Sequence, residues 1–366
     1  MKRKIAAAFA TGLSVVLLAS CGVKGMTGIA DEETKAADTV SVAENEADSA
    51  VQKTEAKAEK KEEEEKVEEY RIGEAWTEDG LWSITMLGAT LTDERNEYSD
   101  LAPGAVYVVD YAYSNLGYED SILDGLYVSL DQEVIDSAGE KGYLYPGTIV
   151  DYPESAPVGA TCKAQACIGV ANPGTFTINM TIFDKAMKPH RAAFVIDPDS
   201  EKAEMALPNI EQPDVETYEI GETWVVDGQW AVAVTDVTET EDRNEFEDKN
   251  PAAVYIVGYD YKNDGYQDTY GEDTDDSSLN GLFITMDDQI VDSQGMMGYS
   301  YAGAIEHQPV IVSLGDSTHA QSCIGVEHPG DFRVSVILYD NKGDKHKGTF
   351  LIKVPPKDQE DGAPSE

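Results

Sequence analysis

The chain has 366 residues, of which 70 are acidic and 27 are basic, and its formal net charge at neutral pH is −43. A negative field of this size repels nucleic acid and anionic lipid surfaces, and it favours cations and basic partners. The composition therefore excludes nucleic acid as an expected partner, although solubility alone also accounts for such a charge.

The N-terminus predicts an export signal. Three basic residues, Lys2–Lys4, precede an apolar run, Ile5–Leu17, and small residues then lead to Cys21. This order resembles a bacterial lipoprotein signal, and the resemblance implies cleavage before Cys21 and attachment of acyl chains to its thiol. The alternatives are a plain secretory signal or a membrane span, but the run is shorter than the ~20 residues that a span needs. We assign residues 1–20 to a signal peptide.

A lipidated Cys21 would hold the protein on a membrane through buried methylene groups, since more than one acyl chain gives stable anchoring. We therefore expect the protein on the outer face of the cytoplasmic membrane, lipid-anchored and displayed at the cell surface. Residues 21–69 carry the lipidated cysteine and a segment rich in Glu, Lys and Ala. Such a segment buries too little apolar area to offset its chain entropy, so we predict a disordered acidic spacer. The alternative is an acidic arm that binds a partner.

From Tyr70 onward the sequence occurs twice. AVYVVDYAYSNLGY (Ala105–Tyr118) matches AVYIVGYDYKNDGY (Ala253–Tyr266), and CIGVANPGTF (Cys167–Phe176) matches CIGVEHPGDF (Cys323–Phe332). We call residues 70–198 repeat 1 and residues 216–355 repeat 2, with a linker at 199–215 and a disordered tail at 356–366. Copies of this length indicate two tandem domains, since solenoid units are much shorter.

Both repeats show the alternation of half-buried strands. Phe176, Ile178, Met180 and Ile182 alternate with polar residues, as the equivalent residues of Phe332–Tyr339 do. No long helical period occurs after Tyr70, so we predict an all-β fold of two tandem antiparallel β-sandwiches. The segment Gly125–Ser137 further predicts a hairpin that turns at Asp131–Gln132.

A family resemblance supports this fold. The lipoprotein-type signal, the acidic spacer, and the RNEY segment (Arg95–Tyr98) followed by AVYVVDYAYSN (Ala105–Asn115) are similar to cell-envelope lipoproteins of Gram-positive bacteria. Those proteins carry immunoglobulin-like domains of unknown function. The resemblance covers both repeats, implies two immunoglobulin-like sandwiches, and offers no catalytic residue to transfer.

A short polar motif recurs between two predicted strands, as ERNEY (Glu94–Tyr98) and DRNEF (Asp242–Phe246). One interpretation is a structural connection in which the arginine pairs with its acidic neighbours, which contributes about 0–1 kcal/mol. The other is a binding loop at one end of a sandwich. The candidate binding residues are Arg95, Asn96, Arg243 and Asn244.

Calcium is the one cofactor that the acidic composition suggests, because carboxylate oxygens are its ligands. The insert of repeat 2 fails as an EF-hand, since Ser278 and Ile284 stand where Gly and Glu are needed. A looser calcium loop would use Asp268, Glu272, Asp273, Asp275 or Asp276. We expect no other metal and no organic cofactor. In particular, we expect no zinc at His319, Cys323 and His328, because a strand would point His319 and Cys323 to the same face but too far apart to converge.

After Cys21, three cysteines remain, Cys162, Cys167 and Cys323. On one strand Cys162 and Cys167 would lie ~16 Å apart on opposite faces, whereas a disulfide needs Cα atoms within ~7 Å. We therefore expect no disulfide between them, and we interpret Cys167 and Cys323 as small buried residues.

No sequence pattern points to catalysis, since nucleophile motifs, phosphate loops and a distinct pair of carboxylates do not stand out. The strand tyrosines favour packing, with a sugar or peptide groove as the alternative: Tyr107, Tyr111, Tyr113, Tyr118, Tyr143 and Tyr145. We predict a non-catalytic binding module for an envelope or extracellular protein or glycan. The alternatives are a carbohydrate hydrolase with a site between the two domains, and a calcium-stabilised structural module.

Overall fold

The computed structural model describes residues 67–120, 124–208, 214–267 and 281–355. The predicted signal peptide, Cys21, most of the predicted acidic spacer, the candidate calcium loop and the predicted C-terminal tail lie outside the described residues. Across the described ranges, the regular elements are all strands, as predicted for an all-β fold. No helix there is long and apolar enough to cross a membrane.

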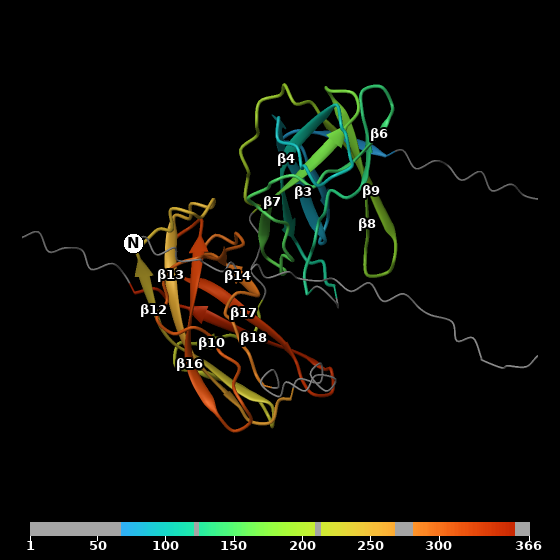
Figure 1. Ribbon diagram of the computed structural model, residues 1–366. Helices are drawn as coiled ribbons and strands as arrows, with labels where there is room; N and C mark the ends of the chain where they lie inside the picture. The colour runs from blue at the N-terminus through green and yellow to red at the C-terminus, as the bar shows by residue number, and fades with distance from the viewer. Residues whose placement is uncertain (1–66, 121–123, 209–213, 268–280, 356–366) are drawn as a thin grey trace, which may run out of the picture. The chain divides into compact units, whose positions relative to one another are not determined.

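Repeat 1 forms one continuous sheet in the order β1-β9-β8-β5-β6-β7-β4-β3-β2. Its strands are β1 (Glu68–Arg71), β2 (Ala75–Glu78), β3 (Trp82–Thr92), β4 (Ala105–Asn115), β5 (Glu133–Ile135), β6 (Lys141–Leu144), β7 (Thr161–Val170), β8 (Phe176–Phe183) and β9 (Pro189–Ile196). Strand β6 joins the two halves, because its first part pairs with β5 and its second part with β7. The sheet therefore bends around the core and nearly closes. Figure 1 shows β3, β4 and β7 side by side in one half.

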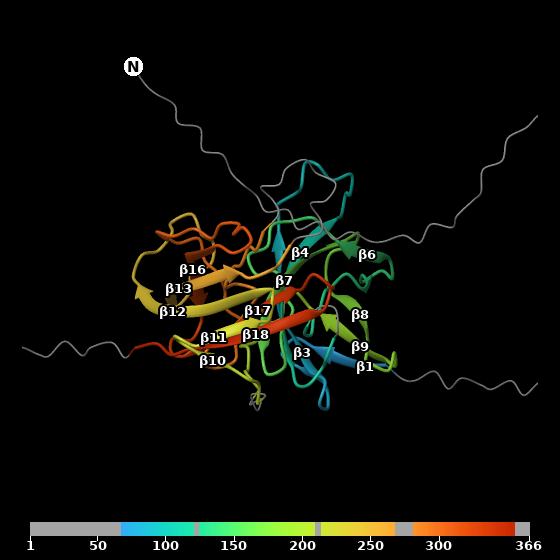
Figure 2. The same ribbon diagram turned by 90° about the horizontal axis from the view of Figure 1, so that it is seen from below.

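Repeat 2 keeps the two halves as separate sheets, ordered β10-β18-β17-β14 and β11-β12-β13-β16-β15. Its strands are β10 (Tyr218–Glu219), β11 (Thr223–Val226), β12 (Trp230–Thr240), β13 (Ala253–Asn263), β14 (Gln289–Val291), β15 (Tyr299–Ser300), β16 (Ser317–Val326), β17 (Phe332–Tyr339) and β18 (Lys345–Ile352). In Figure 2, β12, β13 and β16 follow one another across one sheet. Here β15 pairs with β16, and Val291 and Met297 form an isolated bridge between β14 and the residues just before β15.

In each repeat, alternating apolar residues from the two facing halves of the β-structure fill a shared core. In repeat 1, Ile84 and Tyr111 share a buried cluster with Ile178 and Phe194, which come from the other half of the sheet. Val232 and Tyr259 of repeat 2 meet Val334 and Phe350 in the same way. Burial of each such large apolar side chain contributes about 1.5–3 kcal/mol to the stability of the fold. The strand face that carries these side chains therefore packs against the core.

Two predictions about pairing are wrong in detail. The fold is not wholly antiparallel, because β1 pairs with β9, and β10 with β18, in parallel. The expected hairpin at Asp131–Gln132 is absent, because Leu126 bridges to Ala156 while β5 pairs with β8 and β6. The backbone of Leu126–Leu130 instead forms hydrogen bonds with distant residues. Leu126 exchanges backbone bonds with Ala156, and the Tyr111 hydroxyl donates to the Val128 carbonyl at 2.9 Å. The alternation still predicted burial correctly, since Leu126 and Val128 are buried.

Asp136 links the β5–β6 turn to the β7–β8 turn. Its Oδ1 accepts hydrogen bonds from the backbone N–H groups of Ala138 and Glu140, and its Oδ2 accepts from the backbone and side chain of Asn172. Burial opposes ionisation, but the hydrogen bonds from Asn172 and the turn prevail and lower the pKa of Asp136 to about 2.

This depressed pKa gives a pH-dependent prediction. Replacing Asp136 by Asn should lower the thermal midpoint by several degrees at pH 7, because an amide accepts fewer of these hydrogen bonds. The carboxylate stabilises the fold above the pKa of an unfolded aspartate, about 3.9, and this contribution is lost as the pH falls towards about 2. The gap between Asp136→Asn and the native chain should therefore close on acidification. The exposed Asp131→Asn is the control, and a gap that persisted at low pH would contradict the assignment.

Candidate functional site

The RNEY segment of repeat 1 forms a loop held by its asparagine. The Asn96 side chain accepts a hydrogen bond from the Tyr98 backbone N–H at 2.9 Å and donates to the Pro146 carbonyl at 2.8 Å. The Asn96 backbone N–H donates to the Tyr145 hydroxyl at 2.7 Å. Asparagine suits this place because its amide closes a turn on its own backbone while reaching a second segment.

The DRNEF segment of repeat 2 repeats this arrangement bond for bond. Asn244 accepts from the Phe246 backbone N–H at 3.0 Å and donates to the Ala302 carbonyl at 2.8 Å. Its backbone N–H donates to the Tyr301 hydroxyl at 2.7 Å. We call Thr92–Leu101 and Thr240–Lys249 the RNE loops.

The tyrosine that binds each RNE loop is itself held by a backbone hydrogen bond to a neighbouring strand. Tyr145 is buried, and its backbone N–H donates to the Cys167 carbonyl of β7 at 2.7 Å. Gly147 follows closely, and a Cβ at this position would lie 2.7 Å from the Cys167 sulfur. Tyr301, Gly303 and Cys323 form the same contacts in repeat 2. The Tyr-x-Gly segment and the cysteine are therefore parts of one support for the loop.

Both arginines bind backbone rather than acidic side chains. Arg95 Nη1 donates to the carbonyls of Thr92 and Glu94 at 2.8 Å each. Arg243 donates to those of Thr240 and Asp242. The expected pairing of these arginines with acidic neighbours is therefore wrong, since the guanidinium groups close the loop on itself. The structure thus places all four predicted residues in the two loops, in positioning roles.

The feature that the loops present to solvent is an aromatic side chain. Tyr98 is 90% exposed and Phe246, at the equivalent position, is 86% exposed. Acidic residues flank each aromatic residue in the sequence, including Glu94 and Glu97 in the first loop and Glu245 in the second. In repeat 1 the loop borders a surface hollow of about 440 Å³, which Pro146 and Gly147 complete.

The three cysteines beyond Cys21 are free thiols, and all three are buried. Burial raises the pKa of Cys162 to about 11, and burial also raises the pKa of Cys167 and Cys323. Thiols in such surroundings stay protonated at neutral pH and are poor nucleophiles. Cys162 and Cys167 belong to different buried clusters, so the prediction that they lie on opposite faces is confirmed.

His319, Cys323 and His328 do not converge. His319 Nδ1 lies 2.8 Å from Asp260 Oδ1, and His328 Nδ1 lies 2.8 Å from Asp292 Oδ2. Cys323 packs beneath Tyr301 instead. Over the described ranges, no group of three or more His, Cys, Asp or Glu side chains could hold a metal ion. The candidate calcium residues Asp268, Glu272, Asp273, Asp275 and Asp276 lie outside those ranges.

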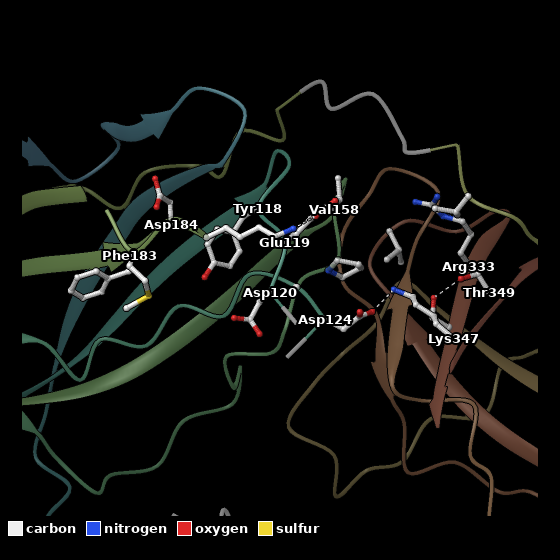
Figure 3. A pocket seen from close by; sticks show the side chains of 17 residues that line it. Tyr118, Glu119, Asp120, Asp124, Val158, Phe183, Asp184, Arg333, Lys347 and Thr349 are labelled. Atoms are coloured by element: carbon white, nitrogen blue, oxygen red, sulfur yellow. Dashed lines mark hydrogen bonds and ion pairs between the residues drawn. The ribbon is translucent and has the colours of Figure 1, made fainter. Parts of the chain in front are cut away.

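The cavity in Figure 3 has a volume of about 780 Å³ and contains side chains from both repeats, which belong to one compact unit, Glu63–Glu366. Two of the carboxylates that line it, those of Asp124 and Glu119, form ion pairs with lysines. Asp124 lies 2.7 Å from the Lys345 ammonium and 2.8 Å from that of Lys347. Although burial alone would raise the pKa of Asp124, these two lysines lower it. Glu119 pairs with Lys185 at 3.0 Å. A general acid in a glycosidase needs a raised pKa, which this environment does not give Asp124.

The strand tyrosines are packing residues, as predicted. Tyr107, Tyr111 and Tyr113 are buried in the main core of repeat 1, Tyr145 is buried under the loop, and Tyr118 and Tyr143 lie against these clusters. The exposed aromatics were the missed feature. The recurrence of an aromatic residue after RNE was visible in both copies and was the signal that pointed to them.

Comparisons with known proteins add little to this geometry. No family model matches the chain, and a comparison with curated proteins finds no relative. Among solved structures, the secreted serine protease VesC from Vibrio cholerae is similar at 12% identity over 72% of this chain and 51% of its own, with a TM-score of 0.18. The chain thus spans about half the length of that protein, and a TM-score this low supports no argument about fold or activity.

Proposed function

We propose that this protein is a lipid-anchored, extracytoplasmic binding module that uses its two RNE loops, without chemistry, to hold a partner protein. One observation carries the proposal. Two loops with the same hydrogen bonds each present an aromatic side chain that is almost wholly exposed, Tyr98 at 90% and Phe246 at 86%.

An exposed aromatic on a fixed loop is suited to binding. Tyr and other aromatic residues dominate the energetics of many protein interfaces, because they bury a large area with few rotatable bonds. Association is penalised by the ordering of loops and side chains. The bonds of Asn96 and Asn244 impose much of that order in advance, so less of it is lost on binding.

The charges around the aromatic residues indicate the chemistry of the partner. The loop Thr92–Leu101 has four acidic residues and one basic residue, and Thr240–Lys249 has five acidic and two basic residues. A complementary surface would offer an apolar recess surrounded by Lys and Arg. Such pairs associate faster at low ionic strength, because unlike charges steer the encounter.

The remaining parts of the proposal rest on the sequence. The export signal and Cys21 favour a lipid anchor on the outer face of the cytoplasmic membrane. The acidic residues before Tyr70 would then act as a spacer that extends away from the membrane. The two-layered cores support the immunoglobulin-like architecture that we assign to both repeats.

Photo-crosslinking of the intact lipoprotein in its own membrane tests the proposal. The photoreactive residue p-benzoylphenylalanine replaces Tyr98, Phe246 or Tyr152 in turn. Tyr152 is the matched control, because it is an exposed aromatic of repeat 1 outside the RNE loop. We expect a discrete protein adduct from positions 98 and 246 but not from position 152, with a yield that falls as salt is added.

The proposal fails if neither loop position gives an adduct, or if position 152 gives the same adduct in equal yield. An adduct that carries carbohydrate and no protein would also contradict a partner protein.

A further inference from the structure

We propose that His307 and His319 of repeat 2 form a binding site for a divalent transition-metal ion such as Zn²⁺, with Asp260 orienting one of the two imidazoles. This site differs from the RNE loops, and it uses none of the residues considered for calcium.

Asp260 is placed to orient the imidazole of His319. Asp260 and His319 are cross-strand partners on β13 and β16, and Asp260 Oδ1 lies 2.8 Å from His319 Nδ1. In a neutral imidazole, a carboxylate at this distance favours the tautomer with the proton on Nδ1, which leaves the Nε2 lone pair to a metal ion. Metal-binding histidines commonly have such a carboxylate behind them, and it increases their basicity.

Gln321 holds the loop that carries His307. The Gln321 backbone N–H donates to the His307 carbonyl at 2.8 Å, and the Gln321 side-chain oxygen accepts from the backbone N–H groups of Glu306 and His307. Gln321 stands two residues after His319 on β16, so both side chains lie on the same face. The loop that carries His307 is therefore fastened beside His319.

The two imidazole rings lie close enough to share one ion. The ring centres of His307 and His319 lie 5.0 Å apart, and their planes make an angle of 76°. Zinc binds imidazole nitrogen at about 2.0–2.1 Å, which puts each ring centre about 3.2 Å from the ion, and a tetrahedral angle then separates two ring centres by about 5.2 Å. The observed spacing fits two imidazoles on one ion.

An edge-to-face contact between aromatic rings has the same range of distances, but repeat 1 has other side chains at these positions. There the equivalent positions hold Asp151 and Lys163, which form an ion pair at 3.2 Å, and Ala112 stands in the place of Asp260. Gln165 makes the same backbone bonds as Gln321. The framework is thus kept while three side chains change together, and in repeat 2 they are the residue types that bind transition metals.

The coordination shell that we infer is incomplete. Since no group of three ligand side chains occurs across the described ranges, two imidazoles would hold the ion, with water or an incoming ligand in the other positions. An open hollow of about 460 Å³ beside His319 leaves room for them. The net charge of −43 also raises the concentration of cations near the surface.

Calorimetric titration of the mature full-length protein with Zn²⁺, in excess Mg²⁺ to saturate non-specific carboxylates, tests the site. We expect one saturable equivalent whose affinity falls at least about tenfold in His307→Gln and in His319→Gln, and about tenfold in Asp260→Asn. Lys163→Gln, at the position of repeat 1 that matches His319, should leave binding unchanged. Cu²⁺ should show electron paramagnetic resonance couplings from two nitrogens, which both histidine variants reduce.

The same three side chains can be placed on the matching framework of repeat 1, which leaves the site of repeat 2 intact. Grafting Ala112→Asp, Asp151→His and Lys163→His into repeat 1 should produce a second equivalent of bound Zn²⁺, provided that circular dichroism shows the graft folded. Zn²⁺ binding that is absent, or that is unchanged in His319→Gln, would overturn the proposal, as would a folded graft that still binds one equivalent.

Discussion

Replacing Trp82 by Ala should lower the free energy of unfolding of repeat 1 by about 3–5 kcal/mol, the usual loss for a fully buried tryptophan. Trp82 is 0% exposed and lies at the centre of an aromatic cluster. Its ring is edge-to-face with Trp76 at 5.6 Å, Tyr118 at 5.7 Å and His190 at 5.3 Å. Alanine would leave a cavity that three separate segments would have to close.

A second substitution at the same position separates packing from hydrogen bonding. The indole N–H of Trp82 finds no hydrogen-bond partner among the residues that the structure describes. Trp82→Phe should therefore cost less than Trp82→Ala, since it keeps a ring and removes a buried polar group that lacks a partner. Trp230→Ala should match Trp82→Ala in repeat 2, where Trp224, Tyr266 and His346 surround the ring.

Chemical denaturation followed by tryptophan fluorescence measures these losses. Tyr98→Ala is the control, because a substitution at an exposed site usually changes stability by less than about 0.5 kcal/mol. A loss below about 1 kcal/mol for Trp82→Ala would be too small for a fully buried tryptophan and would contradict the assignment of this cluster as core.

Gly147→Ala should destabilise repeat 1 by about 1–3 kcal/mol through overpacking. The new methyl group would lie 2.7 Å from the Cys167 sulfur and 3.2 Å from its Cβ. Because Pro146 and Tyr145 bind the RNE loop directly, the strain should also loosen that loop.

The double substitution Gly147→Ala with Cys167→Ala identifies the clash as the cause. Removing the sulfur should recover most of the stability that Gly147→Ala loses, because the added methyl group then occupies its space. A double-mutant cycle measured by denaturation should show a coupling of at least about 1 kcal/mol. Additive effects would mean that the glycine is needed for another reason.

Much of the fold followed from the alternation of apolar and polar residues. Phe176, Ile178 and Met180 are buried as their spacing predicts, and so are Trp82 and Ile84. Which face of a strand is buried can be predicted locally, because alternate residues point to the same face and the apolar ones turn towards the core. Pairing is not local. The parallel contact of β1 with β9 joins segments over one hundred residues apart in sequence, for which alternation gives no partner.

The predicted hairpin failed for a related reason. The segment Leu126–Leu130 has the apolar spacing of a strand, but its backbone is satisfied by the Tyr111 hydroxyl and by Ala156, which come from distant parts of the chain. A sequence pattern records which side chains are buried and does not record such hydrogen-bond partners.

The candidate site was located by the recurrence of the RNE motif, but the roles of its residues were not. Arg95 was expected to pair with acids and instead closes the loop through backbone carbonyls. The bond between Asn96 and Tyr145 spans 49 positions, so only the fold brings the two residues together. His307 and His319 likewise become neighbours through Gln321 and the register of β16, which no motif reveals.

The most direct test of the account compares photo-crosslinking from position 98 with and without Asn96→Ala. If the asparagine presents the aromatic residue to a partner, the adduct from position 98 should fall several-fold. The yield of the adduct from position 246, in the unaltered loop of repeat 2, should be the same with and without Asn96→Ala. Equal adduct yields from position 98 in the two backgrounds would contradict the claim that these hydrogen-bonded loops are the binding site.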